Sequence, residues 1–216
     1  GSAMSSDLVF YGNLLAEIKN RIRQGQTRAA LSANAEMIAM YWDIGRIIHQ
    51  RRSAQEMDGR TAIGRDAFYR MLLRTMPRPG VAPFAMLPWS PHVHLAIFVH
   101  RVTGLTPGLY LLARDLAQTA ARSAAVKPEF AWESPPGCPP ELSLYRLASG
   151  DTQDLARRIS CGQDIAADGC FSLGMLADFE RPLIEHGAWI YPRLFWECGM
   201  IGQVLYLEAE TAGLRG

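Results

Sequence analysis

Two arginines and a serine stand side by side at Arg51, Arg52 and Ser53, within the stretch IIHQRRSAQ at residues 47–55. Each guanidinium can donate a pair of hydrogen bonds to phosphate oxygens, and the hydroxyl can add a shorter one. An arginine pair at a helix end is more often solvated or bound to carbonyls of the last turn. The residue chemistry alone therefore leaves an anion site and an ordinary helix end both open.

Three histidines form the next group that could do chemistry. His92, His94 and His100 share the parity of a strand, so their side chains are expected on one face of a sheet. A metal site would need a further ligand from elsewhere in the chain, and His100 lies too far along the strand. The pattern therefore favours an ordinary, partly exposed sheet face.

Single residues give weaker signals. Glu197 lies in mid-helix beside Trp196, where a carboxylate with a raised pKa could act as a general base, although a surface or capping role is the default.

The four cysteines include no C-x-x-C pair, which argues against zinc and favours buried free thiols. These cysteines are Cys138, Cys161, Cys170 and Cys198.

The composition sets the frame for these groups. The 216 residues carry 22 basic and 21 acidic side chains, a net charge of +1, and 49% of them are hydrophobic. Such a chain fits one ordinary domain, or a domain with a small appendage, and it offers no general attraction to nucleic acid or anionic lipid. We find no secretory signal and no apolar run that could span a bilayer, so we expect a cytoplasmic protein with no membrane partner.

The elements that must position these residues follow from hydrophobic periodicity and turn signals. Amphipathic patterns at 8–23 and 27–50 predict a helical hairpin, and the patterns further along predict an α+β domain. The last helix has apolar residues all round, more than one packing face can absorb, so we expect a homodimer or higher oligomer. Helices are predicted at 65–75, 151–168 (capped by Asp151) and 191–211; strands at 93–102, 109–114, 142–148 and 170–179; and a loop at 127–141.

Four stretches between residues 51 and 216 resemble, in this order, FMN-dependent nitroreductase-like proteins close to the SagB-type dehydrogenase branch. The run G-L-x-P-G-L-Y at 104–110 is fairly specific to that branch. The resemblance implies a nitroreductase-like mixed sheet flanked by helices. The stretches are RRSAQEMDGR (51–60), HLAIFVHRVTGLTPGLYLL (94–112), SCGQDIAADGCFSLGMLADF (160–179) and RLFWECGMIGQVLYLEAETAGLRG (193–216).

The same resemblance implies a cofactor and a reaction. By position, Arg51, Arg52 and Ser53 would bind the FMN phosphate and Gln55 would reach the ring edge. The implied activity is two-electron transfer, with NAD(P)H as electron donor and FMN at the interface of a homodimer. LPWSPHV replaces an element common in the branch, and relatives continue into a glycine-rich segment that completes the phosphate site. The domain is therefore expected to be C-terminally incomplete, with weak flavin binding and low or no activity.

A second resemblance covers residues 9–49, which are similar to the helical N-terminal domain of YhcG-like nucleases, above all at YWDIGRII (41–48). We thus expect a cloning scar at 1–4, a helical hairpin at 5–50 and the flavin-binding domain at 51–216, joined as a fusion. Two alternatives stay open: a non-catalytic oligomeric interaction protein, and nucleic-acid binding through the N-terminal helices. The near-neutral charge argues against the second.

Overall fold

The computed structural model describes residues 20, 54–115, 129–177 and 179–216. The chain divides into two units, residues 1–52 and 53–216. The strands and helices of the described fold belong to the second unit. Apart from Asn20, the helical hairpin predicted at 5–50 lies outside the described residues, as does the triplet at 51–53.

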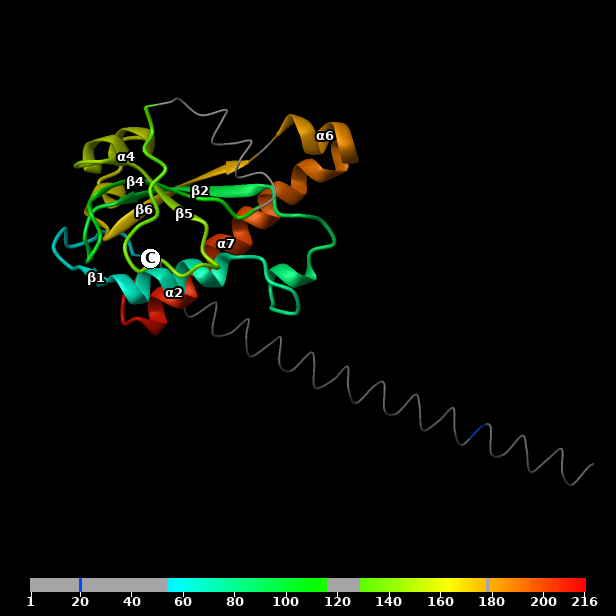
Figure 1. Ribbon diagram of the computed structural model, residues 1–216. Coiled ribbons are helices and arrows are strands. Elements are labelled where there is room, and N and C mark those ends of the chain that lie inside the picture. The colour runs from blue at the N-terminus through cyan, green and yellow to red at the C-terminus, as the bar shows by residue number, and fades with distance from the viewer. Residues whose placement is uncertain (1–19, 21–53, 116–128, 178) are drawn as a thin grey trace, which may run out of the picture. The chain divides into compact units, whose positions relative to one another are not determined.

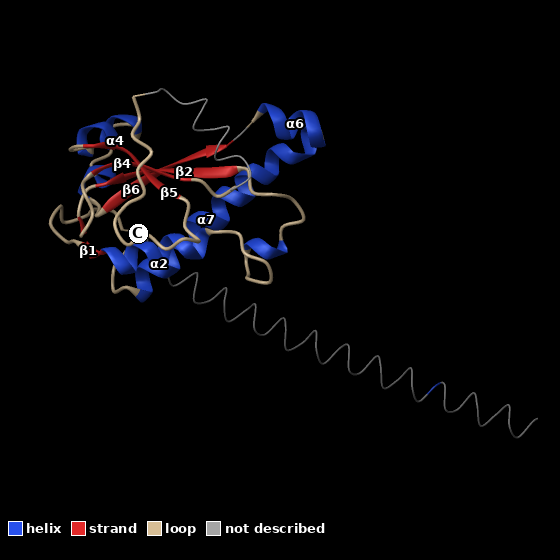
Figure 2. Cartoon of the chain, in the orientation of Figure 1, coloured by secondary structure: helices blue, strands red, loops and turns tan. Residues whose placement is uncertain are grey.

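A four-stranded antiparallel sheet forms the centre of the domain, with strand order β5-β4-β2-β6 (Figure 2). Leu95 of the central strand lies opposite Leu112 on one side and Met175 on the other. A separate sheet of two short parallel strands pairs Ile63 and Gly64 with Val102 and Thr103, which lie in the connection between β2 and β4. The strands are β1 (Ile63–Gly64), β2 (Val93–Val99), β3 (Val102–Thr103), β4 (Gly108–Leu112), β5 (Leu144–Ser149) and β6 (Phe171–Ala177).

Helices cover both faces of this sheet (Figure 1). Alternate residues of β2 separate the two layers: Leu95 and Ile97 join the core with α2 and α7, whereas Phe98 packs with Ala156 and Ala166 from α4 and α5. The helices are α2 (Arg65–Thr75), η1 (Phe84–Met86), α4 (Gln153–Ile159), α5 (Ile165–Asp168), α6 (Glu180–His186), η3 (Ala188–Ile190) and α7 (Tyr191–Thr211).

Most of the predicted elements are observed. The α+β class is confirmed, and α2 and α7 have the predicted bounds. The single helix expected at 151–168 is wrong: it is interrupted between α4 and α5, where Cys161 and Gly162 have φ of 56° and 78°. A left-handed backbone cannot continue a right-handed helix. The predicted bond from a first-turn amide is present, since the Gln153 amide donates to the Asp151 carboxylate at 2.9 Å, but the N-cap residue of α4 is Thr152, whose side chain makes no capping bond.

The three histidines are more enclosed than the sequence suggests. The expectation of a partly exposed face is wrong, because His92, His94 and His100 are all buried. The His100 ring lies 3.0 Å from the carbonyl oxygen of Ala166 in α5, so this end of the strand is covered by a helix. His94 accepts a hydrogen bond at 3.1 Å from the Arg114 amide, which gives it a structural role.

Glu197 is also buried, so the expected surface role is wrong. Its carboxylate pairs with the Arg114 guanidinium and accepts a hydrogen bond at 3.0 Å from the His92 amide. Arg114 donates in addition to the carbonyl oxygens of Thr75, at 2.8 Å, and Val93, at 2.9 Å. This ion pair therefore joins α7 to the end of α2 and the start of β2, and the Glu197 carboxylate has a structural role.

An aromatic cluster surrounds the start of α7. The Arg193 guanidinium lies 4.1, 5.2 and 5.8 Å from the ring centroids of Trp189, Trp196 and Trp89, respectively. A cation over an indole face is attracted by the ring quadrupole. The cluster attaches η3 and the loop before β2 to the first turns of α7.

Gly108 provides a test of the sheet. A Cβ at this position would lie 2.1 Å from the carbonyl oxygen of Ala148 in the neighbouring strand. We expect Gly108→Ala to lower the free energy of unfolding by about 1–3 kcal/mol, because backbone has to shift. Gly174→Ala in β6 is the matched control, since a Cβ there meets nothing within 4 Å. Equal denaturant midpoints for the two variants would contradict this explanation.

Candidate functional site

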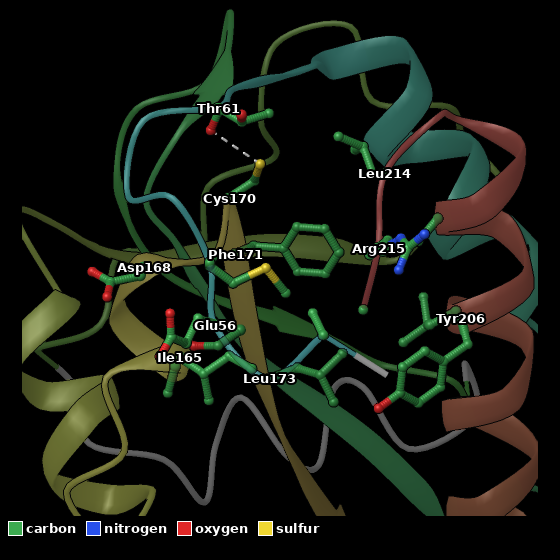
Figure 3. A pocket seen from close by; sticks show the side chains of 18 of the residues that line it. Glu56, Thr61, Ile165, Asp168, Cys170, Phe171, Leu173, Tyr206, Leu214 and Arg215 are labelled. Carbon is green, nitrogen blue, oxygen red and sulfur yellow. Dashed lines mark hydrogen bonds between the residues drawn. The ribbon is translucent and has the colours of Figure 1, made fainter. Parts of the chain in front are cut away.

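A cavity of about 620 Å³ lies between β6, the C-terminal half of α7 and the segment that leads into β1 (Figure 3). Its volume is within the range of roughly 300–1,000 Å³ that is usual for small-molecule sites. Three parts of the chain that are far apart in sequence form its wall, so the cavity depends on the complete tertiary fold.

The middle of the cavity is apolar. Phe171, Leu173 and Met175 of β6 line it together with Leu205 of α7. The Phe171 ring meets the Phe68 ring edge-on, with centroids 5.0 Å apart, so its orientation is fixed by the core. Such a wall suits a flat, largely apolar ring system.

The polar groups of the cavity gather on two opposite sides. Glu56 and Asp168 lie on one side, and Arg215 and Tyr206 lie on the other, with Phe171 between them (Figure 3). This separation would orient a ligand that has a hydrogen-bond donor at one end and a negative charge at the other.

Ser172 of β6 lies between Phe171 and Leu173 in sequence but opposite Phe98, on the sheet face that packs with α4 and α5. Its Oγ is buried and makes no hydrogen bond with any residue in the described part of the chain. The hydroxyl is therefore not assigned to a ligand.

The loop before β1 holds a third carboxylate. Asp58 accepts hydrogen bonds from the Thr61 hydroxyl and from the amides of Thr61 and Arg60, and these lower the pKa of Asp58 to about 2. Asp58 therefore stays ionised near neutral pH and keeps the loop folded back on itself.

Arg101 fixes this loop to the opposite wall. Its Nε donates to the Thr61 carbonyl oxygen at 3.2 Å, and its Nη2 donates to the carbonyl oxygens of Asp168 and, at 2.8 Å, Gly169. The Cys170 thiol adds a bond to the Thr61 carbonyl oxygen at 3.2 Å. Burial raises the pKa of this thiol, so Cys170 is a neutral donor here rather than a nucleophile.

The sequence-predicted site residues adjoin this cavity along the chain. Arg51, Arg52 and Ser53 lie outside the described residues. Ala54, the next residue, lines the cavity, and its amide donates to the Gly216 carbonyl oxygen at 2.9 Å. Gln55 is exposed and stands between two lining residues, Ala54 and Glu56. The roles given to these four residues stay predictions.

Sequence reasoning missed the lining side chains themselves, yet a signal for them was present. Three of the four stretches that carry the nitroreductase resemblance supply all of the wall except Thr61 and Met71: 51–60, 160–179 and 193–216. The fourth, 94–112, forms the central strands. The four cysteines are free, as expected, but the expectation that they are buried is wrong: Cys161 is exposed, and Cys138, Cys170 and Cys198 are only partly buried.

Comparison with known proteins identifies a solved structure of similar fold. No family model matches the chain, and no curated protein matches it. A candidate nitroreductase from Anabaena variabilis, whose crystal structure is known at 1.80 Å resolution, has a similar fold, with a TM-score of 0.53 and 20% identity. The described domain has a nitroreductase-like fold.

At this identity the likeness establishes the fold alone. The match covers 74% of this chain and 29% of that one, so the chain spans less than a third of its structural neighbour's length. Within the nitroreductase-like domain, no described helix is long and apolar enough to cross a membrane. The described residues also include no group of histidine, cysteine and carboxylate side chains placed to hold a metal ion.

Proposed function

We propose that this chain is a cytoplasmic, homodimeric FMN-dependent oxidoreductase of the SagB-type dehydrogenase kind, and that the cavity takes the flavin ring. The observation that carries the proposal is the cavity itself: it is apolar in the middle, has opposite charges at its two sides, and begins at the residue directly after Arg51, Arg52 and Ser53.

The charges decide which way the cofactor would lie. A phosphate dianion is repelled by Glu56 and Asp168 and attracted to Arg215. Arg215 is also one residue from Gly216, whose carbonyl oxygen accepts a hydrogen bond from the amide of Ala54, the residue that follows the triplet in sequence. We therefore assign the phosphate to Arg51, Arg52 and Ser53 with Arg215 nearby, and Gln55 to the ring edge.

The remaining wall would hold the ring. Phe171 and Leu173 would exclude water from its faces, and Glu56 or Asp168 could accept a hydrogen bond from a ring N–H. Bound FMN would supply two-electron transfer between NAD(P)H and a small-molecule substrate.

The test is a titration of the full chain with FMN, followed by quenching of flavin fluorescence. We expect saturable binding that is tighter for FMN than for riboflavin, which lacks the phosphate. Leu205→Trp fills the cavity and should weaken binding at least tenfold, whereas Leu155→Trp on the exposed side of α4 should not. Flavin fluorescence that is unchanged at every protein concentration would overturn the proposal.

A second candidate function is a non-catalytic interaction protein. It is favoured by one observation: large apolar side chains are half or more exposed around the start of α7, among them Phe195 at 61% and Trp196 at 56%. Exposed apolar patches of this size commonly mark interaction surfaces. This candidate function predicts a folded, oligomeric protein that does not bind FMN.

A further inference from the structure

A second cavity, of about 550 Å³, lies where four connecting segments meet at one end of the sheet. Its wall comes from the loop before β1, the end of β2, the turn before β4 and the turn after β5. It has no described lining residue in common with the cavity assigned to the flavin. Its volume is within the range that is usual for small-molecule sites.

Backbone hydrogen bonds hold the wall of the second cavity together. The Gly150 amide donates to the Pro107 carbonyl oxygen at 3.0 Å, which joins the turn after β5 to the turn before β4. The amides of His100 and Arg101 both donate to the Cys170 carbonyl oxygen, at 3.0 and 2.8 Å. The cavity is therefore largely formed before any ligand arrives.

The second cavity carries one charge of each sign. Arg101 and Asp151 are the only charged residues among the described residues that line it. His100, the other ionisable residue of the wall, is 7% exposed, and burial lowers the pKa of its ring, so the ring is neutral near neutral pH. A ligand with a single charge is attracted by one of the two charged side chains and repelled by the other, whereas a zwitterion is attracted by both.

Neither of these charges is neutralised by an ion pair. Within the described residues, Arg101 and Asp151 form no ion pair with each other or with a third residue. The charge of Arg101 contributes to the low pKa of Asp58, but the Asp58 oxygens already accept three hydrogen bonds from Thr61 and Arg60. Two opposite charges that face one cavity and stay apart leave room for a ligand between them.

The Arg101 guanidinium is held in place and still has donors to offer. Its Nε and Nη2 donate to the carbonyl oxygens of Thr61, Asp168 and Gly169. The N–H groups of its Nη1 make no hydrogen bond with any described residue. A guanidinium that is already oriented loses little conformational entropy when it binds a carboxylate, and the bond formed is charge-assisted.

The start of α4 offers acceptors for an ammonium group. Oδ1 of Asp151 accepts from the Gln153 amide at 2.9 Å, which orients the carboxylate and leaves Oδ2 without a partner among the described residues. Nε2 of Gln153 donates to the Ala167 carbonyl oxygen at 3.0 Å, which leaves Oε1 of the same amide to accept. An ammonium group has only donors, so these two oxygens suit it.

We propose that the second cavity binds a small zwitterion, an amino acid, with its carboxylate at Nη1 of Arg101 and its ammonium group at Asp151 and Gln153. The site is separate from the cavity assigned to the flavin, and the proposal does not depend on FMN binding.

The first test is isothermal titration calorimetry of the full chain, without flavin, against glycine, β-alanine and γ-aminobutyrate. These amino acids differ in the distance between their two charges, and we expect saturable binding of at least one of them. Propanoate and propylamine each carry only one of the two charges and should bind about tenfold more weakly, or not at all. No saturable binding of any of the three amino acids would overturn the proposal, as would a single-charge compound that binds as tightly as the best of them.

A pair of matched variants tests the assigned ammonium partner. Asp151→Asn keeps an acceptor for the Gln153 amide but removes the charge, so it should stay folded and lose about tenfold or more in affinity for the best amino acid. Asp154→Asn makes the same change three residues further on, at a side chain that pairs with Arg157 and does not line the second cavity, and should keep the wild-type affinity. Thermal melting without ligand checks that both variants are folded. Wild-type affinity in Asp151→Asn would overturn the proposal.

Discussion

Replacing Glu197 by alanine is expected to lower the free energy of unfolding by about 3–5 kcal/mol. The loss arises because Arg114 would remain buried without its carboxylate partner. Arg114 is 2% exposed, and its guanidinium would keep its charge with only carbonyl oxygens and the Phe84 ring, 4.6 Å from its centroid, as partners. An isolated buried cation is far costlier than the pair. Urea unfolding at fixed protein concentration measures the loss.

A second ion pair on α7 supplies the control. Glu208 pairs with Arg74 at 3.5 Å, but the Arg74 side chain is half exposed, so Glu208→Ala should cost less than about 1 kcal/mol. Converting both buried partners, as Arg114→Met with Glu197→Leu, should restore most of the stability, because no charge then remains buried. A double variant as unstable as Glu197→Ala would show that shape, rather than charge, governs this site.

Replacing Arg52 by alanine is expected to weaken FMN binding by about 10- to 150-fold, provided the proposed cofactor site is right. A charge-assisted hydrogen bond to the phosphate contributes roughly 1.5–3 kcal/mol. Gln55→Ala should weaken binding only about 2- to 12-fold, since a neutral amide at the ring edge contributes roughly 0.5–1.5 kcal/mol. Fluorescence titration of both variants gives the comparison.

Titration of the same two variants with riboflavin separates the phosphate contact from the ring contact. Arg52→Ala should hardly alter riboflavin affinity, because that ligand has no phosphate, whereas Gln55→Ala should weaken FMN and riboflavin alike. Equal losses of FMN affinity for the two variants would mean that the phosphate lies elsewhere in the cavity.

The parts of the fold that could be predicted are those whose signal is local. The periodicity of α2 and α7, the alternation in β2 and the hydrogen bond from the Gln153 amide to Asp151 are all contained in short windows. The break at Gly162 depends on a single residue in a left-handed conformation, which a helical pattern does not reveal. His100 is covered by α5 and His92 packs beside His186 of α6, and both helices come 50 or more residues later, so parity was predictable and exposure was not.

Contacts between side chains far apart in the sequence could not be predicted, for the same reason. Arg114 and Glu197 are 83 residues apart, and neither residue's neighbours mark it as buried. The cavity shows an intermediate case: the stretches that form its wall could be identified by resemblance, but the side chains that enter it could not. Arg101, which fixes two of those walls together, left no signal at all.

The cluster around Arg193 gives the protein a built-in optical reporter. Three of its five tryptophans, Trp89, Trp189 and Trp196, gather at the start of α7, while no described residue that lines the cavity is a tryptophan. Ultraviolet emission therefore comes largely from one end of the domain. Burial of that end against another molecule should shift the emission to shorter wavelength, whereas filling the cavity should leave the wavelength unchanged. Two events at opposite ends of one helix can thus be followed separately, without a label.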